Sequence, residues 1–136
     1  MAISWKSILI ALSLAPAVSL AAEEGLLPLR TGVYVQEGVP CKDPPFAAFF
    51  EYDGHTFLGA HSGDCRSTLV KRQGEDYVVR TTCSALGDGT PASPYSETAA
   101  YSVTSPASVT LTKQGVPSSY RLCTRDELGP GFSRPR

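Results

Sequence analysis

The chain has 136 residues, among them 12 basic and 13 acidic side chains, and a formal net charge of −1. This length suits a single domain. The near balance of charge, without a basic stripe interleaved with aromatic residues, argues against a nucleic-acid partner. The sequence also carries no phosphate-binding or cofactor motif.

The first 21 residues have the composition of a cleaved signal peptide. Lys6 provides a basic start, residues 8–18 form a short apolar stretch, and small residues precede the expected cleavage point. The apolar stretch is interrupted by a serine and a proline and is shorter than the roughly 20 residues of a membrane-spanning helix. We expect cleavage after Ala21, or after Ala22 as second choice, and export to the periplasm or out of the cell.

The remaining chain is expected to form one β domain, residues 22–124, followed by a flexible C-terminal tail, residues 125–136. Removal of residues 1–21 takes away one lysine and leaves 11 basic against 13 acidic side chains, which is an ordinary surface. No helical spacing of apolar residues appears after residue 22, whereas apolar and polar residues alternate repeatedly. This alternation predicts about eight short strands, over residues 31–37, 46–53, 55–61, the two halves of 64–84, 97–105, 108–112 and 118–123.

Residues 64–84 have the pattern of a β-hairpin. Gly74 lies in the middle of a polar turn that would join two alternating segments. With the turn centred there, one face carries three opposed pairs: Cys65 with Cys83, Ser67 with Thr81 and Leu69 with Val79. The other face is polar and would place Arg72 beside Asp76.

Four cysteines in an exported chain most simply form two disulfides, for which three pairings exist. The hairpin register favours Cys65 with Cys83, which leaves Cys41 with Cys123. Cys41 falls in a loop over residues 38–45, where two adjacent prolines exclude a strand. No cysteine belongs to a C-x-x-C pair, so we do not expect a metal site.

Residues 86–96 lack periodicity and contain two glycines and two prolines, which predicts a long exposed loop. Long loops in compact domains are often functional. Asp88, Thr90 and Tyr95 are therefore the predicted binding residues, and an acidic loop tip would suit a cationic partner. The alternative is that this loop is only a mobile connection.

His55, His61 and Asp64 are the one group of residues that could form a reactive site. On a strand over residues 55–61 the two histidines would lie about 20 Å apart, too far to share a metal ion. We therefore expect that the protein is not an enzyme. The alternative is a small envelope hydrolase that uses His61 and Asp64.

The predicted eight-strand pattern, the cysteines after the first strand and in the last one, and the closing run SSYRLC resemble the small periplasmic lysozyme inhibitors of bacteria. In that family a disulfide joins the first and last parts of a β-barrel, and a loop enters the active cleft of the enzyme. The family's Ser-Gly motif is matched at most by Ser62-Gly63, which leads into Asp64 without the expected tyrosine. The pair Cys65 and Cys83 is a further difference from the family.

These patterns predict an all-β domain, an antiparallel meander that closes into a small barrel or folds as a sandwich, with two disulfides. A rigid β domain with one long loop and no convergent titratable groups suits recognition better than catalysis. We expect an exported small binding protein with a protein partner. In its specific form it would inhibit a lysozyme-like or other envelope-targeting enzyme.

Overall fold

The computed structural model describes residue 15 and residues 25–132, so the predicted signal peptide lies outside the described residues apart from one position. No helix in the described part is long and apolar enough to cross a membrane. The elements, in chain order, are β1 (Gly32–Gln36), a 3-10 helix η1 (Phe46–Ala48), β2 (Phe49–Tyr52), β3 (Phe57–Gly59), β4 (Ser62–Gln73), β5 (Asp76–Leu86), β6 (Pro91–Ser105), β7 (Ser108–Lys113), β8 (Val116–Cys123) and α1 (Arg125–Leu128).

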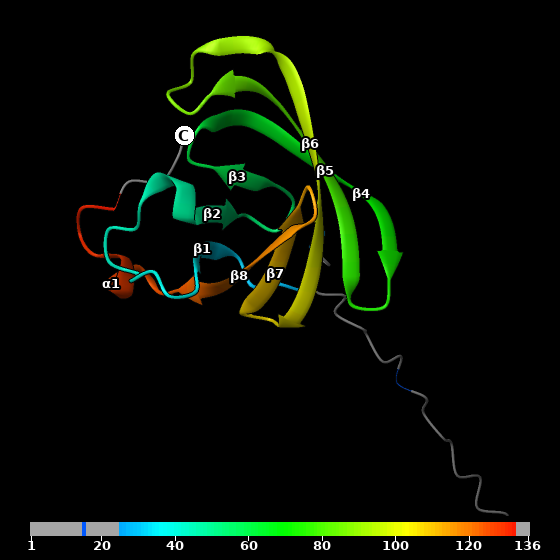
Figure 1. Cartoon of the computed structure of the whole chain (residues 1–136), viewed down its shortest axis with the longest axis horizontal. Helices are drawn as coiled ribbons and strands as arrows, with labels where there is room; N and C mark the ends of the chain where they lie inside the picture. The colour runs from blue at the N-terminus through cyan, green and yellow to red at the C-terminus, as the bar shows by residue number, and fades with distance from the viewer. Residues whose placement is uncertain (1–14, 16–24, 133–136) are drawn as a thin grey trace, which may run out of the picture.

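The eight strands form one antiparallel sheet in the order β3-β2-β1-β8-β7-β6-β5-β4. The last strand pairs with the first, and the sheet curls until its two end strands face each other (Figure 1). The all-β prediction is confirmed, and the sheet is nearly closed into a barrel. At the remaining gap the Phe57 N–H on β3 donates to Ser67 Oγ on β4 at 3.0 Å. At the end of the β4–β5 hairpin the Gly87 N–H donates to the His61 C=O at the same distance, which extends the pairing of these two strands.

The central hairpin has the predicted register and both predicted disulfides are present. Cys65 pairs with Cys83 across β4 and β5, and the second bridge joins Cys41 to Cys123. Within this hairpin the predicted position of Arg72 beside Asp76 was wrong. An irregularity at Val70 adds one residue to β4, so Arg72 lies opposite Tyr77, with its guanidinium carbon 5.2 Å from the ring centroid.

Two predicted strands are shorter than expected because local hydrogen bonds compete with the sheet. Residues 46–48 form η1, in which the Ala48 N–H donates to the Pro45 C=O at 2.9 Å. In the next turn the Asp53 carboxylate accepts from the N–H groups of His55 and Thr56 at 2.8 and 2.7 Å. His55 therefore belongs to a turn rather than to β3.

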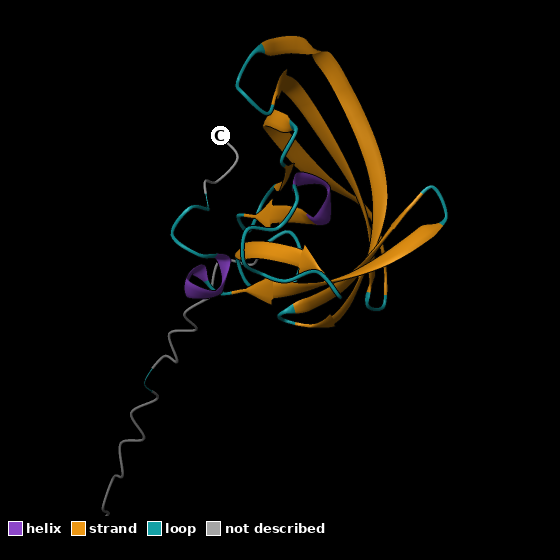
Figure 2. Cartoon of the chain, turned by 60° about the vertical axis from the view of Figure 1, so that its left-hand side comes forward, coloured by secondary structure: helices purple, strands orange, loops and turns teal. Residues whose placement is uncertain are grey.

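The long loop predicted over residues 86–96 was also wrong, because β5 continues to Leu86 and β6 begins at Pro91. Only residues 87–90 form a turn. Among the described residues β7 pairs with β6 from Ala100 onward, which leaves the first part of β6 with one free edge. Prolines are tolerated at such an edge, where no hydrogen bond from their nitrogen is needed. The long strands consequently arch beyond the barrel, as Figure 2 shows.

The barrel interior is filled mainly by aromatic side chains. Phe50 stacks on Tyr34 with ring centroids 5.3 Å apart, and Phe57 stacks on Tyr101 at 4.3 Å. One end of the barrel is closed by Leu27 and Leu29, which precede β1 and belong to the same buried cluster.

A second, outer cluster buries part of the segment over residues 125–136, which was predicted to be a flexible C-terminal tail. It lies on the outside of β1, β2 and β8 and is covered by the segment that contains α1. Thr124 and Glu127 cap this helix reciprocally, and Leu128 is 4% exposed. Phe132 contacts Phe49 edge-on, with centroids 5.2 Å apart. Residues 133–136 lie outside the described part.

The buried tyrosines make the barrel sensitive to alkaline pH. Burial raises the pKa of Tyr34 to about 12, and it also raises the pKa values of Tyr52, Tyr101 and Tyr120. A folded-state pKa above the unfolded value of about 10 stabilises the fold fully below pH 10. We expect this stabilisation to be lost as the pH rises from about 10 through 12. An ultraviolet titration of tyrosinate should therefore coincide with loss of β circular dichroism, and ionisation of all six tyrosines near pH 10 with the fold intact would contradict this prediction.

Candidate functional site

The end of the barrel opposite Leu27 holds a pocket of about 250 Å³, which we call the mouth pocket. Seven aromatic residues line it: Phe46, Phe49, Phe50, Phe57, Tyr95, Tyr101 and Tyr120. Its polar side chains include His61, Ser62, Thr81, Glu97 and Lys113. Open ends of β-barrels are common ligand sites, and this one combines an apolar lining with few polar groups.

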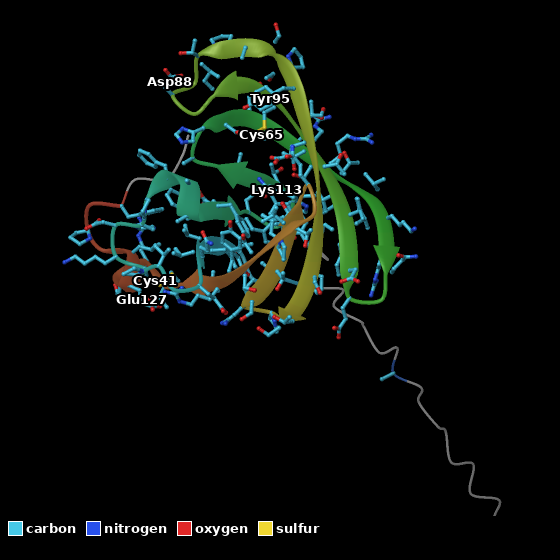
Figure 3. The ribbon with its side chains drawn as sticks, in the orientation of Figure 1. Cys41, Cys65, Asp88, Tyr95, Lys113 and Glu127 are labelled. Carbon is cyan, nitrogen blue, oxygen red and sulfur yellow. A yellow bond between two sulfur atoms is a disulfide. The ribbon has the colours of Figure 1, made fainter. Side chains whose placement is uncertain are left out.

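The strand pattern explains why these residues meet. Successive inward positions of β6 bring Tyr95, Glu97 and Tyr101 to the same side of the sheet. Across from them lie η1 and the short strands β2 and β3, with Phe46 at the edge of the opening. Figure 3 places Tyr95 on the overhanging start of β6 and Lys113 near the hairpin between β7 and β8.

The pocket grades from an exposed rim to a buried floor. Phe46 is 66% exposed and Tyr95 is 40% exposed, whereas Phe57 and Tyr101 on the floor are each 5% exposed. Phe46 also contacts the His61 ring edge-on, with centroids 5.8 Å apart. A ligand could therefore contact rim aromatics without any opening of the core.

One ion pair lies at the pocket. Lys113 Nζ is 3.1 Å from a carboxylate oxygen of Glu97, and both side chains are about half exposed. Burial raises the pKa of Tyr101 inside the barrel, and the negative charge of Glu97 raises it further. The pocket thus has a carboxylate and an ammonium group beside an aromatic floor.

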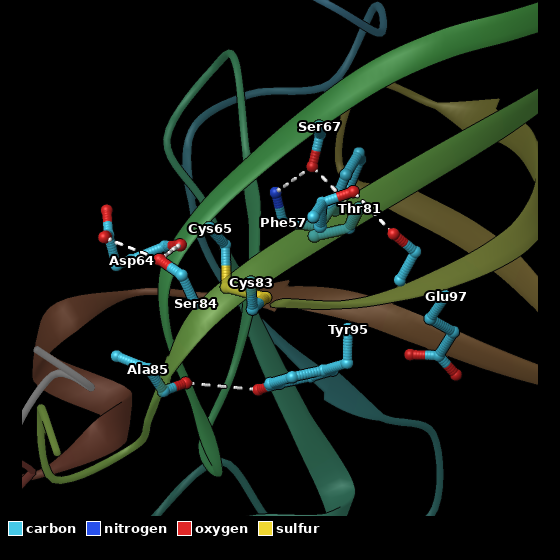
Figure 4. The surroundings of a disulfide bond; sticks show 12 residues. Phe57, Asp64, Cys65, Ser67, Thr81, Cys83, Ser84, Ala85, Tyr95 and Glu97 are labelled. Carbon is cyan, nitrogen blue, oxygen red and sulfur yellow. Dashed lines mark hydrogen bonds between the residues drawn. A yellow bond between two sulfur atoms is a disulfide. The ribbon is translucent and has the colours of Figure 1, made fainter. Parts of the chain in front are cut away.

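The overhanging side of the pocket is held rigidly (Figure 4). The Cys65–Cys83 disulfide joins β4 to β5, and Ser67 and Thr81 share a hydroxyl hydrogen bond of 2.7 Å two residue pairs further along. The Tyr95 hydroxyl donates to the Ala85 C=O at 3.2 Å. These contacts restrict the conformations of the strands that carry the rim.

The three predicted binding residues do not form one site. Asp88 and Thr90 lie in the turn between β5 and β6, where the Thr90 N–H donates to the Asp88 carboxylate at 2.9 Å. This hydrogen bond lowers the pKa of Asp88 and shows that the carboxylate orders the turn. Tyr95 alone of the three lines the mouth pocket.

His61 and Asp64, the two residues of the predicted hydrolase alternative, do not both line the pocket. His61 lines the mouth pocket, whereas Asp64 is not among its lining residues and accepts from the Ser84 hydroxyl at 2.7 Å. Within the described part of the chain no group of three or more His, Cys, Asp or Glu residues could hold a metal ion.

A larger hollow of about 590 Å³ lies between β1, β8 and the C-terminal segment. Phe132 is its one aromatic lining residue, and much of its remaining lining is glycine, proline and other small or aliphatic residues. We place the candidate site at the mouth pocket, because it combines seven aromatic residues with an ion pair.

Sequence reasoning missed Phe46, Glu97 and Lys113 as site residues. The alternation along residues 95–101 contained a usable signal, since it places Glu97 on the same face as Tyr95 and Tyr101. The contribution of Lys113 depends on how β7 meets β6 in the barrel.

Searches against protein-family models, curated proteins and solved structures found no match.

Proposed function

We propose that this chain is an exported small binding protein that recognises a protein partner at the barrel mouth. The observation that carries the proposal is the open pocket with exposed aromatic residues at its rim. Phe46 and Tyr95 offer large, rigid contact surfaces, and aromatic anchors of this kind dominate the energetics of protein interfaces.

Two further exposed apolar residues support this location. Val116 is 66% exposed and pairs with Lys113 at the mouth, and Leu86 is 47% exposed and pairs with Ser62, which also lines the pocket. Each of the two is therefore an exposed apolar residue paired with a residue of the pocket lining. The two disulfides fit an oxidising compartment such as the periplasm or the extracellular space.

In its narrower form the proposal is that the partner is a lysozyme-like or other envelope-targeting enzyme, which this protein inhibits. The acidic residue Glu97 in the lining of the mouth pocket would suit a cationic enzyme. The hydrolase alternative has less support, because the Asp64 carboxylate is engaged by Ser84 outside the pocket.

The test compares partner capture by the wild-type mature protein and two variants. Phe46→Ala combined with Tyr95→Ala removes the rim aromatics, and Val70→Ala removes an equally apolar, 50% exposed side chain on β4 as the control. We expect wild type and control to retain the same envelope protein, and the rim variant to bind it at least about tenfold more weakly.

The rim variant must keep both disulfides and the circular dichroism of a β protein, so that weaker binding cannot be attributed to unfolding. Full retention of the partner by the rim variant would contradict the proposed site. A direct assay of lysozyme activity with the purified protein tests the narrower form: absence of inhibition at saturating concentration would reject it and leave the partner capture to be judged separately.

A further inference from the structure

We propose that the mouth pocket binds an arginine side chain of the protein partner, with the guanidinium on Glu97 in the place that Lys113 holds in the free protein. This inference rests on the proposed function, because it names the group that the partner would insert. It is carried by the different lengths of the two charged side chains, by the aromatic lining and by the size of the pocket.

The acidic member of the ion pair has the shorter side chain and lies in the interior of a long strand. Glu97 lies within the long strand β6, directly opposite Thr81 of β5, and the residues before and after it are also paired with β5. Lys113 is the last residue of β7 and is followed by a turn in which Gln114 and Gly115 both have positive φ. Its four-carbon chain allows the ammonium group to turn toward solvent, whereas the shorter Glu97 side chain keeps its carboxylate closer to β6.

The ion pair between Lys113 and Glu97 is weak, so a ligand cation can displace the Lys113 ammonium from the carboxylate. Its side chains are 48% and 58% exposed, and ion pairs at such positions contribute little to stability because water screens them. A guanidinium can replace the ammonium and add a second parallel hydrogen bond to the carboxylate, which a lysine cannot form. In the free protein the Lys113 ammonium thus occupies the position on Glu97 that the guanidinium of the ligand would take.

The remaining lining favours a cation over an anion. The faces of aromatic rings carry partial negative charge and attract guanidinium groups. Glu97, Lys113 and His61 are the charged or basic groups of the pocket, and with Lys113 swung away the carboxylate is the only formal negative charge left to pair. The volume of about 250 Å³ lies below the roughly 300–1,000 Å³ of sites for drug-sized molecules, which suits one inserted side chain.

The experiment titrates the isotope-labelled mature protein with N-acetyl-arginine amide, followed by NMR chemical shifts. N-acetyl-citrulline amide is the matched neutral probe, because it has nearly the same shape without the charge. The variants are Glu97→Gln and Lys113→Gln, with Lys71→Gln on β4 as a control that removes one exposed positive charge far from the pocket. The wild-type spectrum provides the check that each variant is folded.

We expect shifts at the pocket residues with the arginine probe and at least about tenfold weaker binding of the citrulline probe. Lys113→Gln should bind arginine about three- to tenfold more tightly, since it removes the competitor. Glu97→Gln should lose the binding, and Lys71→Gln should match wild type.

Three results would overturn the inference. Tighter binding by Glu97→Gln with weaker binding by Lys113→Gln would indicate an anion site, and equal binding of the two probes would indicate a neutral ligand. Absence of pocket shifts at saturating probe would reject the site for arginine. Because partner capture by the rim variant is measured independently, failure here with a rim-dependent partner would leave the proposed function standing.

Discussion

Replacing Phe50 by alanine is expected to lower the free energy of unfolding by about 3–5 kcal/mol. Phe50 is 7% exposed and lies at the centre of the aromatic interior. Its ring contacts those of Tyr34, Phe57 and Tyr120, with centroid distances of 5.3, 5.7 and 5.1 Å. Truncation removes both its own transfer free energy and its contacts with these neighbours, because close-packed rings cannot collapse into the space.

Such a loss would be a large part of the stability of a domain, which is typically about 5–15 kcal/mol. Urea denaturation followed by circular dichroism measures it, and Phe46→Ala is the matched control. Phe46 is an aromatic residue of the same pocket but is 66% exposed, so its truncation should change stability by only about 0.5 kcal/mol. Equal costs for the two variants would contradict the position of Phe50 in the core.

Much of the central fold could be predicted because its determinants are local. Gly74 adopts a φ of +60° in the turn of the hairpin, and the opposed cysteines specify the same register from the other end. Residues 97–105 and 108–112 alternate strongly, so their strands were also recovered. The bulge at Val70 was not, because the order Leu69, Val70, Lys71 contains no glycine or proline that would mark an extra residue in the strand.

The errors occurred where tertiary pairing or local capping overrides composition. Pro91 and Pro94 predicted a loop, yet both are accommodated in β6 beside a free edge that becomes apparent only when the sheet order is known. The segment after Cys123 contains few apolar residues, but Leu128 and Phe132 suffice to cover the outer cluster. Burial of so short a segment depends on the surface that β1, β2 and β8 present to it.

The candidate site could be predicted only in part. Tyr95 was identified from its expected exposure and does line the mouth pocket, although it lies on a strand rather than in a loop. Asp88 and Thr90 were chosen by the same reasoning, but polar turn residues commonly hydrogen-bond their own backbone, and these two do. Phe46 and Lys113 come from opposite sides of the barrel, so only its closure brings them to one pocket.

Removing the Cys41–Cys123 disulfide, by replacing both cysteines with alanine, is expected to cost about 4.5 kcal/mol of unfolding free energy. The bridge joins residues 82 positions apart, so it restricts most of the domain in the unfolded state. It also fixes the loop of residues 37–45 against β8, where Arg121 donates to the Gln36 and Val39 carbonyl oxygens at 3.0 and 2.7 Å.

The second disulfide provides the internal comparison. Cys65 and Cys83 are only 18 positions apart, and the same chain-entropy relation gives about 3.2 kcal/mol for their removal. Denaturant unfolding of the two double-alanine variants should therefore rank Cys41–Cys123 as the costlier loss. The opposite order would mean that the hairpin bridge contributes mainly through the folded state. In that case its role would be to hold β4 and β5 together at the overhanging side of the mouth pocket, where Cys83 forms part of the lining.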